Sequence, residues 1–216
     1  MTIGIIGEGV SDFYTLRSIL QSFTEDKALP LNQLQPKSKM EPGNWDKVFK
    51  YCATDEFRQA FAFNDYIVIQ VDTDFLRSDS IPQEYIVPKM ESLTPSEINV
   101  AMRTLLINAI GKDFYQEHSA AIIFAIAVDQ IECWFLAIYF PNSPAKSKKH
   151  KNCIETLNPE LQTKHGFTIV RKQEVYYLEI CKAFKKKGDL INLSKSNDSF
   201  LTFIKELEEK LLIVQQ

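Results

Sequence analysis

The sequence predicts an α/β fold with an open, mainly parallel sheet, helices on both of its faces and a C-terminal helical extension. Apolar runs of strand length alternate with segments of helical periodicity over residues 1–140, which is the pattern of βαβ units. The strongest run, residues 66–71, is β-branched and almost continuous, as expected for a parallel strand buried on both faces. The first run, residues 3–6, ends in Gly7-Glu8-Gly9 and leads directly into a helical pattern.

The elements follow one another in a regular order along the first part of the chain. We expect a strand over 3–6, a helix capped by Ser11, a short strand around 32–35, a helix over 44–63, a strand over 66–71, a loop or lid over 77–95, a helix over 95–118, a strand over 120–128 and a helix over 129–139. From Phe140 the chain is polar and less periodic until an amphipathic helix over 197–212. We therefore expect a core of residues 1–140 and an extension of residues 141–216 packed on it in one compact unit.

The composition is that of an ordinary globular protein. The chain has 216 residues, of which 45% are apolar and 25% charged, and this length suffices to bury a substantial core. A net charge of -3 argues against a protein that holds nucleic acid by bulk charge alone. A local basic cluster is nevertheless present at Lys146, Lys148, Lys149 and Lys151, and solvated lysines on loops explain it equally well.

The four cysteines predict free thiols in a reducing, cytoplasmic setting. Cys52, Cys133, Cys153 and Cys181 are far apart, with no C-x-x-C pair and no histidine recognised at the spacing of zinc ligands. Cys133 lies in an apolar run and is interpreted as a small buried hydrophobe. The chain also shows neither a signal-peptide pattern nor an apolar stretch of membrane-spanning length.

Acidic residues gather at the predicted carboxyl ends of the strands, where open α/β sheets place their reactive groups. Asp72 and Asp74 are two residues apart and share a face if the strand continues. Asp12 lies one helical turn after Glu8, so that both can face one crevice. The set comprises Glu8, Asp12, Asp72, Asp74, Asp129 and Glu132.

Converging carboxylates need a cation. At separations of about 5 Å and an effective dielectric of about 20, each pair repels by a few kcal/mol. All the expected ligands are hard oxygen donors, which Mg²⁺ or Mn²⁺ prefers and zinc does not. The sequence therefore predicts an acidic Mg²⁺ or Mn²⁺ site built from Glu8, Asp72 and Asp74, with Asp12 and Glu132 as further members.

Several other interpretations stay open. Gly4, Gly7 and Gly9 form G-x-x-G-x-G, close to the dinucleotide fingerprint, but Glu8 would place a negative charge where pyrophosphate binds. A D-x-D after a buried strand is also typical of sugar-nucleotide transferases and aspartyl-phosphate phosphatases. Alternatively, the carboxylates near residue 8 stabilise a helix N-terminus and those near residue 72 cap a turn.

The motifs resemble the Toprim family of metal-dependent nucleic-acid enzymes, in which a glutamate ends the first strand and a D-x-D ends the third. Glu8 and Asp72-Thr73-Asp74 correspond to these motifs. The segment Glu8-Gly9-Val10-Ser11-Asp12 further resembles the E-G-x-[ST]-[DE] start of small OLD-type and RloB-like Toprim nucleases. Residues 131–136 (IECWFL) and 197–200 (NDSF) resemble two later helices of that group.

This resemblance implies Mg²⁺-dependent cleavage of phosphodiester bonds in DNA or RNA, with a Toprim core over residues 1–140. Asp72 and Asp74 would hold one metal, Glu8 would serve as ligand or general base, and Asp12 and Glu132 would complete a second metal position. A lysine would neutralise charge in the transition state, and the candidates for substrate binding are Lys146, Lys148, Lys149 and Lys172.

The resemblance also implies a cytoplasmic effector of anti-phage defence, with an ATPase encoded nearby as a possible partner. Two alternatives remain at this point. One is a Toprim-like protein that binds nucleic acid or a partner without catalysis, and the other is a phosphoryl- or glycosyl-transfer enzyme that uses D-x-D alone.

Overall fold

The computed structural model describes residues 1–37, 43–78, 80–170 and 173–211. It confirms the predicted fold class, because it contains an open four-stranded sheet, entirely parallel, in the order β2-β1-β3-β4. The strands are β1 (Ile3–Ile6), β2 (Leu31–Gln35), β3 (Tyr66–Asp72) and β4 (Ile122–Ala127). The helices are α1 (Val10–Thr24), α2 (Trp45–Cys52), α3 (Asp55–Gln59), α4 (Pro95–Ile110), α5 (Lys112–His118), α6 (Leu136–Tyr139), α7 (Pro144–Ser147), α8 (Cys153–His165), α9 (Glu174–Ile180), α10 (Lys187–Ser194) and α11 (Asp198–Leu211).

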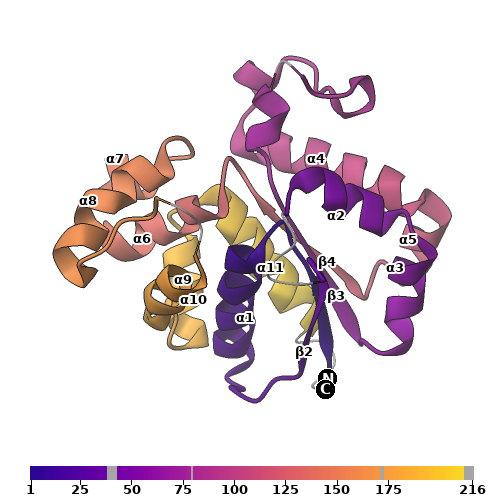
Figure 1. The fold of residues 1–216 in the computed structure, drawn as a ribbon, viewed down its shortest axis with the longest axis horizontal. Helices are drawn as coiled ribbons and strands as arrows, with labels where there is room; N and C mark the ends of the chain where they lie inside the picture. The colour runs from indigo at the N-terminus through magenta and orange to yellow at the C-terminus, as the bar shows by residue number, and fades with distance from the viewer. Residues whose placement is uncertain (38–42, 79, 171–172, 212–216) are drawn as a thin grey trace.

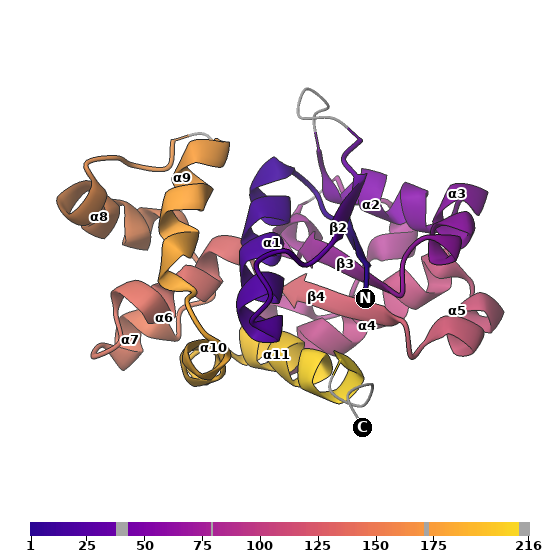
Figure 2. The ribbon, with the colours of Figure 1, turned by 90° about the horizontal axis from the view of Figure 1, so that it is seen from below.

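Helices cover both faces of the sheet (Figures 1 and 2). On one side lie α2, α3, α4 and α5, and on the other lie α1 and α11. Two separate apolar clusters fill the two interfaces. Every residue of β1, β3 and β4 is buried, which explains why these strands are continuous apolar runs instead of alternating patterns.

The predicted C-terminal helical extension is confirmed. Helices α6 to α10, here called the C-terminal lobe, lie beside α1 (Figure 2), and α9 and α10 contact that helix directly. The chain then returns to the sheet, where α11 packs on β4. The polar stretch that follows Phe140, in which no single helix was located from the sequence, contains α7, α8, α9 and α10.

Three predicted helices differ in detail. Gly9, and not Ser11, is the N-cap of α1. The helix expected over 44–63 divides at Thr54, whose side chain caps α3. The helix expected over 95–118 divides at Gly111, where φ is 92°, a conformation that glycine adopts without steric cost.

Among its described residues, the segment predicted as a loop or lid over 77–95 contains short 3₁₀ turns at Gln83–Tyr85 and Met90–Ser92. The segment before α6 is a 3₁₀ turn over Ile131–Phe135. No helix among the described residues has the length and apolar character that crossing a membrane requires.

A buried tryptophan, Trp134, connects residues 131–136 with residues 197–200. Trp134 is fully buried, and its ring stacks on Phe200 with ring centroids 5.0 Å apart. Its indole N–H donates to Ser199 Oγ at 2.9 Å, and Ser199 in turn donates to the Asn197 side chain. Residues 131–136 and 197–200, distant in the sequence, thus form one packed unit under β4.

We expect Trp134→Ala to lower the free energy of unfolding by about 3–5 kcal/mol, because it empties a packed site and leaves the Ser199 hydroxyl without its indole donor. Urea denaturation measures this change. Phe63→Ala is the matched control, since Phe63 is 77% exposed and its truncation should change stability by less than about 0.5 kcal/mol. Equal effects of the two substitutions would contradict the described core.

Candidate functional site

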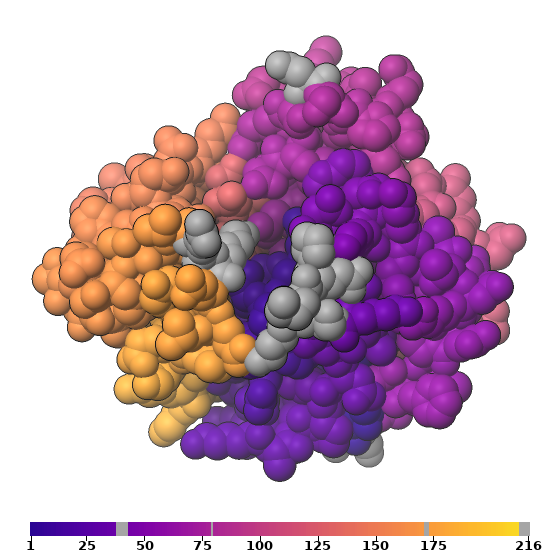
Figure 3. Space-filling view, viewed as in Figure 1, coloured from indigo at the N-terminus to yellow at the C-terminus, as the bar shows by residue number. Residues whose placement is uncertain are grey.

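The topology brings the ends of β1 and β3 together. The chain leaves β1 for β2 on one side and later returns to β3 on the other side, so that β1 and β3 flank the point where the strand order reverses. Their register pairs Ile6 with Ile69, which places residues 7–8 beside residues 70–72. Figure 3 shows the surface hollowed between the C-terminal lobe (orange) and the purple part of the chain, with N-terminal residues (indigo) at its floor.

Glu8 links the two strand ends. Its carboxylate Oε1 accepts a hydrogen bond from the backbone N–H of Asp72 at 2.7 Å. Its own backbone N–H donates to Gln70 Oε1 at 3.3 Å. The structure therefore brings Glu8 and Asp72 together as the sequence predicted, with the glutamate carboxylate directly at the end of β3.

Gln70 is a residue that sequence reasoning missed. It is fully buried, and its amide Nε2 donates to Asp72 Oδ1 at 2.8 Å while its Oε1 accepts from Glu8. Gln70 thus orients both acidic residues from within the sheet. The available signal was a single polar residue inside an otherwise apolar strand, because a buried amide persists only where it is hydrogen-bonded.

The two aspartates of the D-x-D differ in environment. Asp72 is only 3% exposed, and its Oδ1 also accepts the backbone N–H of Ile131 at 3.0 Å. Asp74 is exposed, and its Oδ2 accepts from Gln130 Nε2 at 3.0 Å. The strand ends at Asp72, and Asp74 opens a 3₁₀ turn, so strand alternation does not place the two carboxylates on one face.

Asp12 and Glu132 have structural contacts of their own. Asp12 is buried in the first turn of α1, where its Oδ2 accepts the backbone N–H of Gly9 at 2.7 Å. Glu132 is fully buried and accepts a hydrogen bond from the Tyr177 hydroxyl of α9. The second metal position expected from these two residues stays a prediction.

The candidate lysines lie on the C-terminal lobe. Lys146, Lys148 and Lys149 are exposed. The ammonium of Lys146 lies 4.5 Å from the centroid of the Phe140 ring, and Lys149 donates to Thr156 Oγ1 at 3.0 Å. Lys172 lies outside the described residues.

The loop after β4 is hydrogen-bonded to the D-x-D segment through Asp129. Thr73 is fully buried, its Oγ1 accepts the backbone N–H of Asp129 at 2.9 Å, and its N–H donates to the Asp129 carbonyl at 2.9 Å. Asp74 N–H donates to the same carbonyl at 3.1 Å. Asp129 adopts a positive φ of 69°, uncommon for a residue with a side chain, and its carboxylate pairs with Arg77.

The cysteine prediction is wrong for one pair. Cys133 and Cys153 are joined by a disulfide, while Cys52 and Cys181 are free and buried. Cys133 is therefore a crosslink between the turn at Ile131–Phe135 and the start of α8, in addition to being buried. The expectation of four free thiols failed because the two partners, 20 residues apart, meet only through tertiary packing.

Burial also suppresses the reactivity of the two free thiols. Desolvation raises the pKa of Cys181 to about 12, and it raises the pKa of Cys52 as well, so both stay protonated at neutral pH.

A pocket of about 650 Å³ lies at the opposite, amino-terminal ends of the strands, between Tyr66, Arg103 and Lys210. Two of its basic residues, Arg103 and Lys210, form ion pairs with Glu206. The pocket is therefore distinct from the acidic strand ends, and its ion pairs have a structural explanation.

Comparisons of the chain with protein-family models, with curated proteins and with solved structures found no match.

We expect Thr73→Val to lower the free energy of unfolding by about 1–3 kcal/mol, because the buried N–H of Asp129 loses its acceptor while the side-chain shape is kept. Thermal or urea denaturation measures the loss. Thr104→Val is the control: its hydroxyl bonds a carbonyl within α4 on the exposed surface, and its loss should cost less than about 0.5 kcal/mol. If Thr73→Val left the free energy of unfolding unchanged, the hydrogen bond between Thr73 and the Asp129 N–H would not stabilise the loop after β4.

Proposed function

We propose that the chain is a Toprim-type metal-dependent nuclease that cleaves phosphodiester bonds in DNA or RNA, with Glu8, Asp72 and Asp74 as the residues that hold Mg²⁺ or Mn²⁺. One observation carries the proposal: the Glu8 carboxylate reaches the end of β3, 2.7 Å from the backbone nitrogen of Asp72, at the reversal of strand order. Ligands of open α/β folds bind at this position.

The topology supports the resemblance seen in the motifs. A glutamate after the first strand and a D-x-D after the third act on one substrate only if these strands are neighbours. Here β1 and β3 are neighbours and parallel, so both motifs lie at the same edge of the sheet. A glycosyl- or phosphoryl-transfer enzyme that relies on D-x-D alone would leave the placement of Glu8 unexplained.

The donor chemistry fits a hard divalent cation. Glu8, Asp72 and Asp74 offer carboxylate oxygens, which are the ligands that Mg²⁺ and Mn²⁺ prefer. When bound, such a cation neutralises charge on the phosphate and lowers the pKa of bound water. In this proposal Asp12 and Glu132 are not assigned to the metal: the Asp12 carboxylate accepts the backbone N–H of Gly9, next to Glu8, and the Glu132 carboxylate accepts from the Tyr177 hydroxyl.

The protein residues have separable roles in this proposal. Asp72 is held by Gln70 and by the Ile131 N–H, which keep its carboxylate in one orientation. Glu8 is partly exposed, and the proposal assigns it as a ligand or as the base that accepts a proton from the attacking water. Asp74 is exposed, so it can reach a cation from the solvent side.

Nucleic acid is the proposed substrate, and the exposed lysines of the C-terminal lobe, Lys146, Lys148 and Lys149, are the proposed phosphate contacts. A role in anti-phage defence, a cytoplasmic location and an ATPase partner follow from the resemblance alone.

We expect the double substitution Asp72→Asn, Asp74→Asn to reduce Mg²⁺-dependent cleavage of DNA or RNA by at least about 100-fold, because it removes two anionic ligands while keeping side-chain size. Glu8→Gln should cause a comparable loss. Cleavage of labelled single- and double-stranded substrates with and without Mg²⁺ measures the effect. The control Asp55→Asn, Asp113→Asn removes two exposed carboxylates elsewhere and should retain activity.

Two outcomes would contradict the proposal. Cleavage by the Asp72→Asn, Asp74→Asn variant at the unaltered rate would exclude these residues as the metal site. Binding of nucleic acid with no metal-dependent turnover of any substrate by the unaltered chain would favour the non-catalytic alternative.

We expect Lys146→Ala, Lys148→Ala, Lys149→Ala to weaken nucleic-acid binding and to flatten its salt dependence. Each lost phosphate contact lowers the slope of log K against log salt concentration by about 0.9 on duplex DNA. Fluorescence anisotropy in the Asp72→Asn, Asp74→Asn background measures this without cleavage. Alanine at the exposed Lys27, Lys112 and Lys205 is the matched control, and an equal effect of the two triple variants would show that the proposed surface is not specific.

A further inference from the structure

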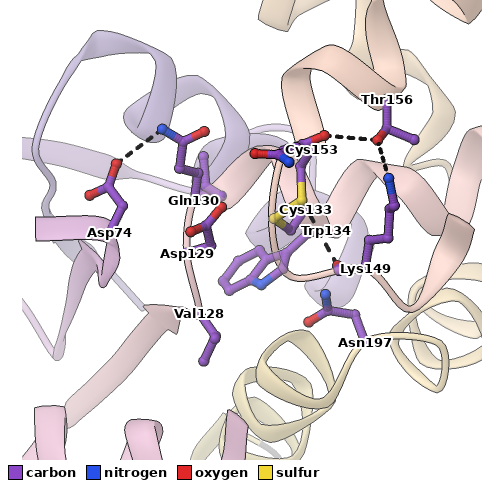
Figure 4. The surroundings of a disulfide bond; sticks show 12 residues. Asp74, Val128, Asp129, Gln130, Cys133, Trp134, Lys149, Cys153, Thr156 and Asn197 are labelled. Carbon is purple, nitrogen blue, oxygen red and sulfur yellow. Dashed lines mark hydrogen bonds between the residues drawn. A yellow bond between two sulfur atoms is a disulfide. The ribbon is translucent and has the colours of Figure 1, made fainter. Parts of the chain in front are cut away.

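A second group of possible metal ligands lies next to the acidic strand ends, and the proposed nuclease does not use it. The carboxylate of Asp129 and the sulfurs of Cys133 and Cys153 lie within 4.8 Å of one another, and all three residues are buried. In Figure 4 the Asp129 carboxylate faces the disulfide. In a tetrahedral zinc site, Zn–S bonds are about 2.3 Å long and Zn–O bonds about 2.1 Å. Two ligand atoms of the same ion are then about 3.3–3.9 Å apart.

Two polar residues accompany the disulfide. Asp129 lies beside it in a left-handed backbone conformation, with its carboxylate paired to Arg77. His150, three residues before Cys153, has a buried Nδ1 without a hydrogen-bond partner among the described residues. A buried polar atom of this kind calls for an explanation, and a nearby bound ion is one.

His150 lies close to Cys153 in the sequence, with H-x-x-C spacing. It is not one of the three residues whose ligand atoms lie within 4.8 Å of one another, so the described geometry does not make it a ligand.

The charges of the cluster balance around a divalent ion. Two thiolates and the Asp129 carboxylate carry three negative charges, and the carboxylate already pairs with the Arg77 guanidinium. A divalent cation together with Arg77 neutralises all three.

We propose that Cys133 and Cys153, when reduced, form with Asp129 a buried site for Zn²⁺, and that the disulfide is the oxidised form of this site. Thiolate ligands select zinc over Mg²⁺, so the site is chemically distinct from the all-oxygen set at Glu8, Asp72 and Asp74. This inference is independent of the proposed nuclease activity.

The two forms interconvert by a balanced exchange. A dithiol reductant transfers two electrons and two protons to the Cys133–Cys153 disulfide, which yields two thiols while the reductant becomes a disulfide. Zinc then binds the two sulfurs and releases both thiol protons. Oxidation by a disulfide of the same class reverses the exchange and expels the ion.

The test measures zinc on the full chain. The protein is reduced with a phosphine, incubated with Zn²⁺, freed of unbound metal and assayed for bound zinc by mass spectrometry. We expect a single zinc ion per reduced chain and a loss of about tenfold or more in Cys133→Ala, Cys153→Ala. The control Cys52→Ala, Cys181→Ala, which removes the two free buried cysteines, should keep its zinc.

A spectroscopic measurement on the unaltered chain tests the proposal even where a cysteine variant fails to fold. Co²⁺ bound to the unaltered reduced chain should show a thiolate-to-metal charge-transfer band, and this band should disappear on oxidation to the disulfide. Absence of the thiolate band, or equal zinc in the Cys133→Ala, Cys153→Ala variant and the unaltered chain, would overturn the proposal. Neither result bears on cleavage through Glu8, Asp72 and Asp74.

Discussion

β1 and β3 run side by side in the same direction, with both strands buried on both faces, and this pairing determines where each strand can leave the sheet. Because their carboxyl ends coincide, the residues that follow them are forced together whatever the intervening chain does. Glu8 meets the N–H of Asp72 for this reason, and Gln70 is able to bond both. The same pairing separates the two apolar clusters, so the acidic strand ends lie on a scaffold packed from both sides.

The sequence predicted correctly those elements whose apolar pattern matches their burial in the folded protein. The runs at residues 3–6, 66–71 and 120–128 are apolar because both faces of each strand are covered, and all three are strands. The proximity of Glu8 to Asp72 followed from the rule that parallel strand ends meet. The relative orientation of the Asp72 and Asp74 side chains could not be predicted in this way. The alternation of side chains along β3 ends at Asp72, and Asp74 already belongs to a 3₁₀ turn.

The parts that were missed depend on contacts between distant segments. Helix α8 buries only Cys153, Leu157 and Leu161, and it contains Pro159. So narrow an apolar stripe, in a polar segment rich in lysine, gives a weak helical pattern in the sequence. The roles of Gln70 and Thr73 arise from partners on other strands and loops, which no local spacing reveals. The group formed by Asp129, Cys133 and Cys153 is a further example, since these residues are far apart in the sequence and only the structure brings their ligand atoms within 4.8 Å of one another.

Asp129 has contacts on both sides of the loop that follows β4. Its backbone N–H and carbonyl bond Thr73 and Asp74, and its carboxylate contacts Arg77 and faces the Cys133–Cys153 pair. A positive φ at a residue with a side chain costs of order 1 kcal/mol or more, so this conformation persists because several contacts require it together. The backbone of Asp129 thus positions the D-x-D segment, while its side chain serves the neighbouring cluster of Arg77 and the two cysteines.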